Sequence, residues 1–576
     1  MRGQGMRLGW GGGAAAAVMV SALMSAVPMA QSGRAVVTSA AEAGDLAQVR
    51  RLLRDGADVN AALGDGTTAL HQAAMRGDAD MVDVLVYAGA NVKATTRLGG
   101  YTPLHLASQR GHAVVIDRLV KAGADPNQAT ATGTTPLMFA AASGHVDAVK
   151  QLVAHKADLN ATELASDQTA LMFAAAFERP EVVKLLVEVG ADLARTSKVT
   201  DIAALTSPEE ALQEEIRLQT QRASAQSSRP APAPRSPENE TPGLTRPYRY
   251  NELIGKQGGL GAIHYAARQG SLASVQALLD GGANVNQRAG GDDTTPLLIA
   301  VLNGHYDLAM YLLERGADPT AASDAGATPL YATVNIEWAP RSFYPQPRAQ
   351  LQQRTNYLDL MRALLDKGAD PNARLRKKLW YTQYNFDLLR TDEGGATAFW
   401  RAAYASDLEA MKLLLAHGAD PFITTIKGPT QQRQQGGVQA GDPTRLQPMP
   451  AGSPGINALH AAAGVGYGEG FAGNAHRFAP TGMLAAVKFL VEEVHVDVNS
   501  VDDDGNTAVH HAASRGDNEM IVYLVSKGAD VTRVNRAGLT TLDMANGPVQ
   551  RTQPYPETIK LLESLGAKNN HRCVSC

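Results

Sequence analysis

The chain has 576 residues, with 53 Lys and Arg against 57 Asp and Glu, so its formal net charge is −4. That balance gives no general attraction to nucleic acid or to an anionic membrane surface. Aromatic residues make up only 5% of the chain. Small residues are abundant, which suits thin helical units packed on their neighbours.

The first thirty residues form a segment of their own. Arg2 and Arg7 give it a positive start, and Ala14–Met24 is a short apolar run that precedes Ala30. This pattern is typical of a secretory signal peptide. We therefore expect residues 1–30 to be cleaved and the protein to be exported, to a periplasm or to the extracellular space. An uncleaved anchor or an unstructured start is the alternative. No other apolar stretch approaches 20 residues, so no membrane span is expected after cleavage.

One four-residue sequence motif then recurs along most of the chain, and it is called the motif below. Its full form is Thr102-Pro103-Leu104-His105, and the neighbouring copies stand 34 residues before it and 33 after it. A Gly-Ala-Asp/Asn landmark or a variant of it follows most copies. A fixed period of this size indicates one supersecondary unit stacked many times. The other copies start at Thr68, Thr135, Thr169, Thr295, Thr328, Thr397 and Thr507.

The unit that begins at Thr102 predicts two helices. Thr102 can cap a helix whose first residue is Pro103, where the missing N–H costs nothing. Gly111 is expected to end that helix. A second helix is expected from about Ala113, because apolar residues follow at helical spacing, and Gly123 suits a left-handed cap at its end.

Motif, period and Gly-Ala-Asp landmark together resemble the ankyrin repeat, a unit of helix, turn, helix and hairpin loop. The resemblance covers most of the chain. It implies an all-α solenoid of about twelve units that binds a protein partner and is not an enzyme. The motif histidines are then expected to fix the loops of the scaffold. Each stands a repeat or more from the next, so they need not converge on a metal. They are His71, His105, His264, His460 and His510.

The landmarks predict two arrays rather than one. Residues 33–194 hold about five repeats and residues 260–567 about seven. Residues 195–258 lack any ankyrin landmark and are expected to form a linker, with a short helix followed by a disordered Pro/Ser-rich tether from Ser227 to Pro242. Long insertions are expected in the second array, at 335–356, 373–393, 423–455 and 465–481.

The resemblance also implies where a partner binds, because ankyrin arrays use a concave face made of loop tips and exposed first-helix positions. These are the residue before each motif Thr and the two residues before the glycine between the helices. A plain solvated surface is the alternative for any one of them. The candidates are Met75, Arg76, Tyr101, Gln109, Arg110, Arg268, Gln269 and Arg515.

Two of the insertions are rich in aromatic and basic residues. Trp, Tyr and Arg often anchor protein interfaces, so we predict that this region contributes more to partner binding than the concave face of the first array. The alternative is that the same aromatics pack onto the solenoid as a local core. The candidates in the second of these insertions are Arg376, Trp380, Tyr381 and Tyr384.

The tail, residues 568–576, holds both cysteines of the chain, Cys573 and Cys576. A disulfide between them is the default expectation. The spacing also resembles the Cys-x-x-Cys-His attachment site of haem c, at the junction where some bacterial secreted ankyrin proteins continue into a cytochrome-c-like segment. The axial His is missing here, so haem c is expected only if the C-terminus is truncated, and the alternative function is then electron transfer. No metal site, no other cofactor and no catalytic constellation is predicted.

Overall fold

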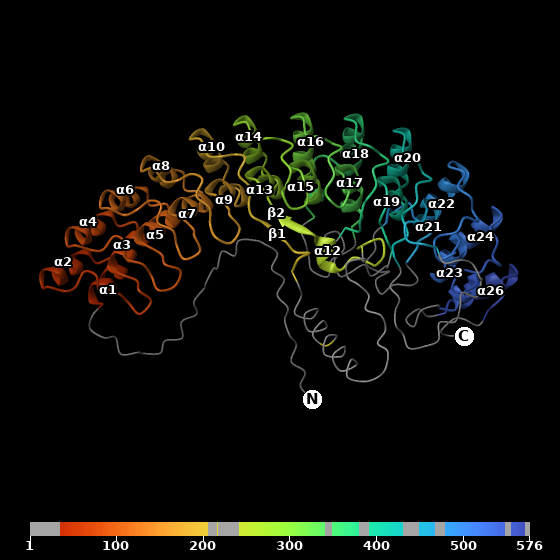
Figure 1. Ribbon diagram of the computed structural model, residues 1–576, viewed down its shortest axis with the longest axis horizontal. Helices are drawn as coiled ribbons and strands as arrows, with labels where there is room; N and C mark the ends of the chain where they lie inside the picture. The colour runs from red at the N-terminus through yellow and green to blue at the C-terminus, as the bar shows by residue number, and fades with distance from the viewer. Residues whose placement is uncertain are drawn as a thin grey trace, which may run out of the picture.

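The computed structural model describes residues 35–205, 216, 241–339, 348–379, 391–429, 449–466, 478–547 and 554–570. Within these residues, twelve pairs of helices stack side by side into a curved solenoid (Figure 1). The second helix of each pair lies on the convex side, and the loops that join one pair to the next project from the concave side. The expected all-α repeat solenoid of about twelve units is confirmed.

The first helices of the pairs are called inner helices here, and all except α1 begin within a copy of the motif or of its variants. The inner helices are α1 (Val36–Ala43), α3 (Ala69–Arg76), α5 (Pro103–Arg110), α7 (Pro136–Ser143), α9 (Ala170–Ala176), α13 (Ala262–Gln269), α15 (Pro296–Leu302), α17 (Pro329–Glu337), α19 (Ala398–Tyr404), α21 (Ala458–Ala462), α23 (Ala508–Ser514) and α25 (Thr541–Ala545). The outer helices are α2 (Leu46–Arg54), α4 (Ala79–Tyr87), α6 (Ala113–Lys121), α8 (Val146–Ala154), α10 (Pro180–Glu188), α14 (Leu272–Asp280), α16 (Tyr306–Glu314), α18 (Tyr357–Asp366), α20 (Leu408–Ala416), α22 (Met483–Glu492), α24 (Asn518–Ser526) and α26 (Pro556–Ser564).

The motif forms its helix through reciprocal capping at the start of α5. The Thr102 hydroxyl accepts a hydrogen bond from the His105 N–H, and the Thr102 N–H donates to Nδ1 of His105 at 3.0 Å. Two backbone donors at the helix end are therefore satisfied. Gly111 ends the helix with a φ of 79°, a left-handed conformation that glycine adopts without strain. The boundaries predicted from the sequence of this unit are confirmed.

Asparagines of the landmark tie successive units together. Nδ2 of Asn127 donates to the carbonyl of Lys156 in the next unit, and its Oδ1 accepts from the N–H of Asp158 at 2.7 Å. Asn60, Asn286, Asn372 and Asn499 make the same pair of bonds. The landmark thus fixes the spacing of the loops as well as the turn.

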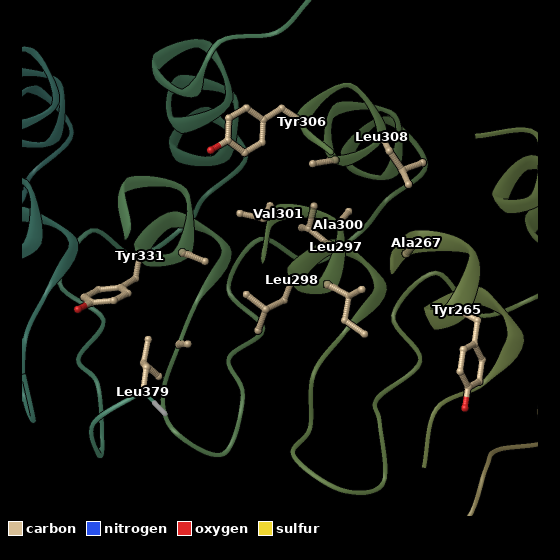
Figure 2. Packing of buried hydrophobic residues seen from close by; sticks show 14 of the residues in the cluster. Tyr265, Ala267, Leu297, Leu298, Ala300, Val301, Tyr306, Leu308, Tyr331 and Leu379 are labelled. Carbon is tan, nitrogen blue, oxygen red and sulfur yellow. The ribbon is translucent and has the colours of Figure 1, made fainter. Parts of the chain in front are cut away.

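The core is one continuous layer of small and branched side chains between neighbouring pairs. Figure 2 shows Leu297, Leu298 and Val301 of α15 filling the space between α13 and α17, and all three are fully buried. Because each helix pair buries its apolar face only against its neighbours, stability depends on contact along the stack.

The expectation of two separate arrays is wrong, because the stack runs on without a break. Helix α9 packs on α13, and α10 packs on α14. Across this seam, Gln168 donates to the Tyr265 hydroxyl at 2.7 Å and Gln269 donates to the carbonyl of Ala176 at 2.9 Å. The fifth and sixth repeats are therefore direct neighbours.

The segment expected to be a linker is instead an insertion whose two ends meet. Strand β1 (Val199–Asp201) pairs antiparallel with β2 (Lys256–Gly258), and the short helix α12 (Tyr250–Ile254) precedes β2. Most of the tether and nearly all of the short helix expected before it lie outside the described residues, as does the expected signal peptide.

The structure describes only parts of the four insertions expected in the second half. Helix α17 runs to Glu337, so the first insertion starts three residues later than expected and contains a short 3-10 helix, η2 (Ala349–Gln352). Leu375 and Leu379 are buried against the repeats, so the start of the second insertion is part of the core. Most of 423–455 and of 465–481 lies outside the described residues. No helix of the described part is long and apolar enough to cross a membrane.

Candidate functional site

The concave face is built on the C-terminal ends of the inner helices, and these ends are capped by the next repeat. Nε2 of His112 bonds the carbonyl of Met75 at 3.1 Å, and Nε of Arg179 donates to the carbonyl of Ala142 at 3.0 Å. His305 bonds the carbonyl of Arg268 in the same way. A donor at this place satisfies a helix-terminal carbonyl that would otherwise lack a partner.

The same side chains lie over the glycines that follow the inner helices. A Cβ at Gly77 would overlap the ring of His112, and a Cβ at Gly111 would overlap the ring of His145. Glycine is therefore required at these positions both for its left-handed backbone and for the space above it.

Three residues selected for partner binding are engaged in contacts of this kind. Nη1 of Arg76 donates to the carbonyl of Glu42 at 3.1 Å, although the side chain is exposed. Gln269 bonds across the seam to α9. Arg515 donates to the carbonyl of Ala463 and pairs with Asp517 at 2.6 Å, with only 13% of its side chain exposed. Arg515 is thus a residue of the stack, and its selection as a contact residue is wrong.

Other selected residues lie on the open surface of the inner helices. Met75 is 36% exposed, and Gln109 and Arg110 are exposed at the end of α5. Tyr101 is half-buried, and its carbonyl accepts a hydrogen bond from Nε2 of His71. Arg268 is also half-buried. Met75, Gln109 and Arg110 thus lie at the C-terminal ends of α3 and α5, which pack on each other.

A row of apolar side chains on this face was missed by the sequence reasoning. Leu106, Phe139 and Phe173 occupy the residue directly after the motif in the third, fourth and fifth repeats, and all three are half-buried. The Phe139 ring lies 5.7 Å from that of Tyr101, and the Phe173 ring lies 6.4 Å from that of Phe177. The available signal was two phenylalanines at equivalent positions in a chain poor in aromatics.

The equivalent position is buried in the later repeats. Tyr265 and Ile299 are buried in the sixth and seventh repeats, Arg401 is 1% exposed in the ninth, and His511 is 2% exposed in the eleventh. The large apolar side chains left partly open at this position are therefore confined to repeats 3 to 5 of the described part.

Trp338 belongs to a buried polar network and not to an open surface. Its indole N–H donates to the carboxylate of Asp407 at 2.7 Å, and its carbonyl accepts from Nη2 of Arg401 at 3.0 Å. Nε of Arg401 also donates to Oδ1 of Asn335 at 2.6 Å. Buried polar groups need such partners, so Trp338 packs as local core, as the alternative interpretation of the insertions proposed.

Of the four candidate contact residues in the second insertion, the structure describes one, Arg376. Arg376 is exposed, and its N–H donates to the carbonyl of Ala325. Trp380, Tyr381 and Tyr384 lie outside the described residues, as do Cys573 and Cys576, so the prediction that the insertions bind a partner stays a prediction.

The motif histidines are scaffold residues, as expected. His71 joins Thr68 to the carbonyl of Tyr101, and His264 bonds the carbonyl of Gln287 at 2.9 Å. Burial lowers the pKa of His105, His264, His460 and His510 to about 4. Among the described residues, no group of three or more His, Cys, Asp or Glu side chains is arranged to hold a metal ion.

Comparison with known families agrees with this architecture. The family model for ankyrin repeats in three copies matches residues 37–130, 115–197, 248–332 and 475–573, and the single ankyrin repeat model matches 394–426. These matches cover well over half of the chain. The chain belongs to the ankyrin-repeat family. Ankyrin repeats are typically interaction modules without enzymatic activity, so the array is a scaffold for protein–protein contact.

Individual relatives resemble only parts of this ankyrin chain. Mouse protein phosphatase 1 regulatory subunit 27 is 45% identical over 73 residues, which is 12% of this chain and 46% of that protein. Alpha-latrocrustotoxin-Lt1a of Latrodectus tredecimguttatus is 26% identical over 279 residues, 48% of this chain and 14% of the toxin. Palmitoyltransferase AKR1 of Lachancea kluyveri is 42% identical over 183 residues, 29% of this chain and 23% of the enzyme. The chain thus spans less than half of each of these relatives.

Proposed function

We propose that this chain is an exported, non-enzymatic scaffold that binds a protein partner on the concave face of repeats 3 to 5. The observation that carries the proposal is the row formed by Leu106, Phe139 and Phe173. Apolar side chains are half-open there, while the same position is buried in the later repeats. Apolar anchors with a polar rim are typical of protein interfaces, and the exposed Gln109 and Arg110 supply part of that rim.

The binding test compares two surfaces of one molecule. A pull-down with the mature chain identifies a partner, and titration calorimetry then measures its affinity. We expect the double variant Phe139→Ala and Phe173→Ala to weaken binding by about 2 kcal/mol or more, the size of an interface hot spot. The matched double variant Trp380→Ala and Tyr381→Ala probes the insertion.

Melting curves of both double variants separate lost contacts from lost stability. Equal affinity of the Phe139/Phe173 variant and the native chain would refute the concave-face site. If only the Trp380/Tyr381 variant loses affinity, partner binding belongs to the insertions.

Export is the second part of the proposal, and it rests on the charged and apolar pattern of residues 1–30. The protein isolated from its native host is expected outside the cytoplasm and to begin at Gln31. N-terminal sequencing of that material tests this. A chain that retains Met1 or Arg2 in the cytoplasmic fraction would exclude the signal peptide.

Electron transfer through a c-type haem is the second candidate, on the condition that the natural C-terminus extends past Cys576 and supplies the axial histidine, because Cys573 and Cys576 have the spacing of a haem attachment site. The absorbance of protein purified from its native compartment distinguishes the two candidates. A Soret band that survives denaturing extraction would favour the haem. Its absence, together with a mass that fits a Cys573–Cys576 disulfide, would favour the plain scaffold.

A further inference from the structure

The apolar row on the concave face of repeats 3 to 5 ends at a buried residue on both sides. At the position after the motif, Gln72 of repeat 2 and Tyr265 of repeat 6 are buried, so the half-open row consists of Leu106, Phe139 and Phe173. These three side chains come from α5, α7 and α9, and α7 packs on both of the others. Neighbouring helices lie about 8–10 Å apart, so the row is about 16–20 Å long.

Small side chains lie beside the row in repeats 4 and 5. Three residues after the row position, the inner helices of these repeats carry Ala142 and Ala176, both half-buried. The corresponding residues of repeats 3 and 6 are the larger Gln109 and Arg268. Less side-chain volume therefore covers the inner helices of repeats 4 and 5, which leaves room there for bulky apolar groups of a partner.

Arginines dominate the charge at the ends of these inner helices. The inner helices α5, α7, α9 and α13 and the turns that follow them carry Arg110, Arg179 and Arg268. They carry one carboxylate, that of Glu178, which is exposed. The arginines lie at both ends of the apolar row, because Arg110 belongs to repeat 3 and Arg268 to repeat 6.

These arginine charges are not neutralised within the described part of the protein. Neither Arg110 nor Arg268 forms an ion pair there, and Arg110 is exposed. Nε of Arg179 donates to the carbonyl of Ala142, which carries no net charge. By contrast, Arg118 on the outer helix α6 pairs with a carboxylate of α4. The guanidinium groups at the helix ends can therefore pair with an anionic partner.

The tips of the loops that join these repeats do not cancel this charge. Arg97 and Lys198 are exposed at loop tips, and Asp167 is half-buried at another. Glu163 is buried, and its carboxylate accepts three backbone N–H bonds. The whole chain has a net charge of −4, so a positive surface is a local property of this face. Such a surface favours a partner of negative charge.

An α-helix matches the spacing of the row. Residues seven apart in a helix share a face and lie about 10.5 Å from each other, close to the step between repeats. In a β-strand, residues on one face repeat about every 6.6 Å, which does not match that step. The apolar stripe of an amphipathic helix is about 100° wide, so it can cover the row and the alanines beside it. From Arg110 to Arg268 is three repeat steps, about 24–30 Å, the length of about 16–20 helical residues.

We propose that the segment bound by this face is an acidic amphipathic helix of about 16–20 residues that lies along the stack. Its apolar side chains contact Phe139 and Phe173, and its carboxylates lie near Arg110 and Arg268. This inference rests on the concave-face site proposed above and adds the chemistry of the partner. Glu178 opposes binding of such a helix, because it is the carboxylate at the helix ends.

Synthetic peptides test this chemistry on the full chain by fluorescence anisotropy. The probe is a labelled peptide of about 18 residues, with leucines along one helical face and glutamates on both flanks of that face. Matched peptides replace every glutamate by glutamine or by lysine. At about 0.05 M salt we expect the glutamate peptide to bind at least about 10-fold more tightly than the glutamine peptide, and the lysine peptide to bind least. At about 0.5 M salt the difference should shrink, because the charges are screened.

A fourth peptide tests the helix. It has the glutamate sequence with two prolines in the central turn, which break an α-helix. We expect it to bind at least about 10-fold more weakly than the unbroken peptide, because ordering the bound segment then loses its helical form.

Variants of the chain assign the charge effect to named residues. The double variant Arg110→Glu and Arg268→Glu should weaken binding of the glutamate peptide by about 10-fold or more and should strengthen binding of the lysine peptide. Glu178→Gln should strengthen binding of the glutamate peptide by about 2-fold to 5-fold. The matched control is Arg51→Glu with Lys184→Glu, two exposed sites on the outer helices α2 and α10, and it should leave both affinities unchanged.

The outcomes separate this inference from the function on which it rests. Equal binding of the glutamate and glutamine peptides, or no loss in the reversed-arginine variant, would overturn the acidic partner. Equal binding of the proline peptide would overturn the helix. If no peptide binds while a captured partner still depends on Phe139 and Phe173, the concave-face site stands and the acidic helix is wrong. If the captured partner does not depend on these two residues, the site itself is wrong.

Discussion

Arg401 offers a sharp test of how the middle of the solenoid is held together. Its guanidinium is fully buried between α17 and α19 and donates to Oδ1 of Asn335 and to the carbonyl of Trp338. Arg401→Met keeps most of the side-chain volume and removes both bonds. A hydrogen bond from a charged donor contributes about 1.5–3 kcal/mol. The apolar replacement offsets part of the loss, because the charge no longer has to be desolvated. The expected destabilisation is therefore about 3–5 kcal/mol.

The assay can be confined to this region. Apart from Trp10 in the expected signal peptide, the tryptophans of the chain are Trp338, Trp380 and Trp400. Intrinsic fluorescence during urea unfolding of the mature chain therefore reports on repeats 8 and 9. Arg376→Met is the matched control, because Arg376 is exposed, and it should change stability by less than about 0.5 kcal/mol.

A double-mutant cycle tests whether Arg401 and Asp407 act as one buried pair bridged by Trp338. Asp407→Asn preserves an acceptor for the N–H of Ala410 while removing the charge. An interaction of the two groups through Trp338 predicts that this second change costs at least about 1 kcal/mol less in the Arg401→Met background than in the native chain. A loss below about 1 kcal/mol for Arg401→Met, or additive effects in the cycle, would refute the reasoning.

Three further predictions concern the stack. Leu104→Ala should lower the free energy of unfolding by about 2–5 kcal/mol in urea melts, since Leu104 is 1% exposed. Leu98→Ala, at a loop tip with 79% exposure, should change the free energy of unfolding little, and equal effects of the two variants would be inconsistent with the assigned core. Cleavage at a protease site engineered into Ser227–Pro242 should leave the two halves bound to each other, because α9 and α10 pack directly on α13 and α14; separate elution in gel filtration would restore the two-array interpretation. The free energy of unfolding should be highest above about pH 6.5 and should fall toward pH 4, since the unfolded chain takes up protons that the folded chain excludes. At pH 5 the expected loss is about 2 kcal/mol for each histidine whose pKa is about 4. Urea melts that do not change between pH 7.5 and pH 5 would contradict buried neutral histidines.

The sequence was most informative where structure depends on local chemistry. Thr102, Pro103 and Gly111 determine a helix through capping, a fixed φ and a left-handed end, and each acts within one unit. The boundaries of α5 and α6 could therefore be predicted closely. The scaffold role of the motif histidines could be predicted for the same reason, because His105 bonds a threonine only three residues away.

Long-range contacts explain where the sequence reasoning failed. Nothing in residues 195–258 shows that Val199 pairs with Gly258, and without that pairing the segment resembles a linker instead of an insertion. Arg515 has the position of a surface residue, but it donates to the carbonyl of Ala463, 52 residues earlier. A periodic pattern predicts which face of a helix is apolar, but it does not predict which polar side chain the next repeat uses as a cap.

This division also bears on where a binding site can be sought in the molecule. Side chains next to the inter-helix glycines are under two demands, since they cap the preceding repeat and also border the concave face, as Arg76 and Gln269 do. Leu106, Phe139 and Phe173 at the position after the motif have no polar side-chain group and do not cap a helix, whereas Arg401 at this position donates to the carbonyl of Trp338 at the end of α17. This position is filled by Phe139 and Phe173 where the face is open, and by Arg401 and His511 where the position is buried. Variation at that position therefore carries more information about partner binding than variation at the helix ends, and repeats 3 to 5 are where it leaves apolar surface for a partner to cover.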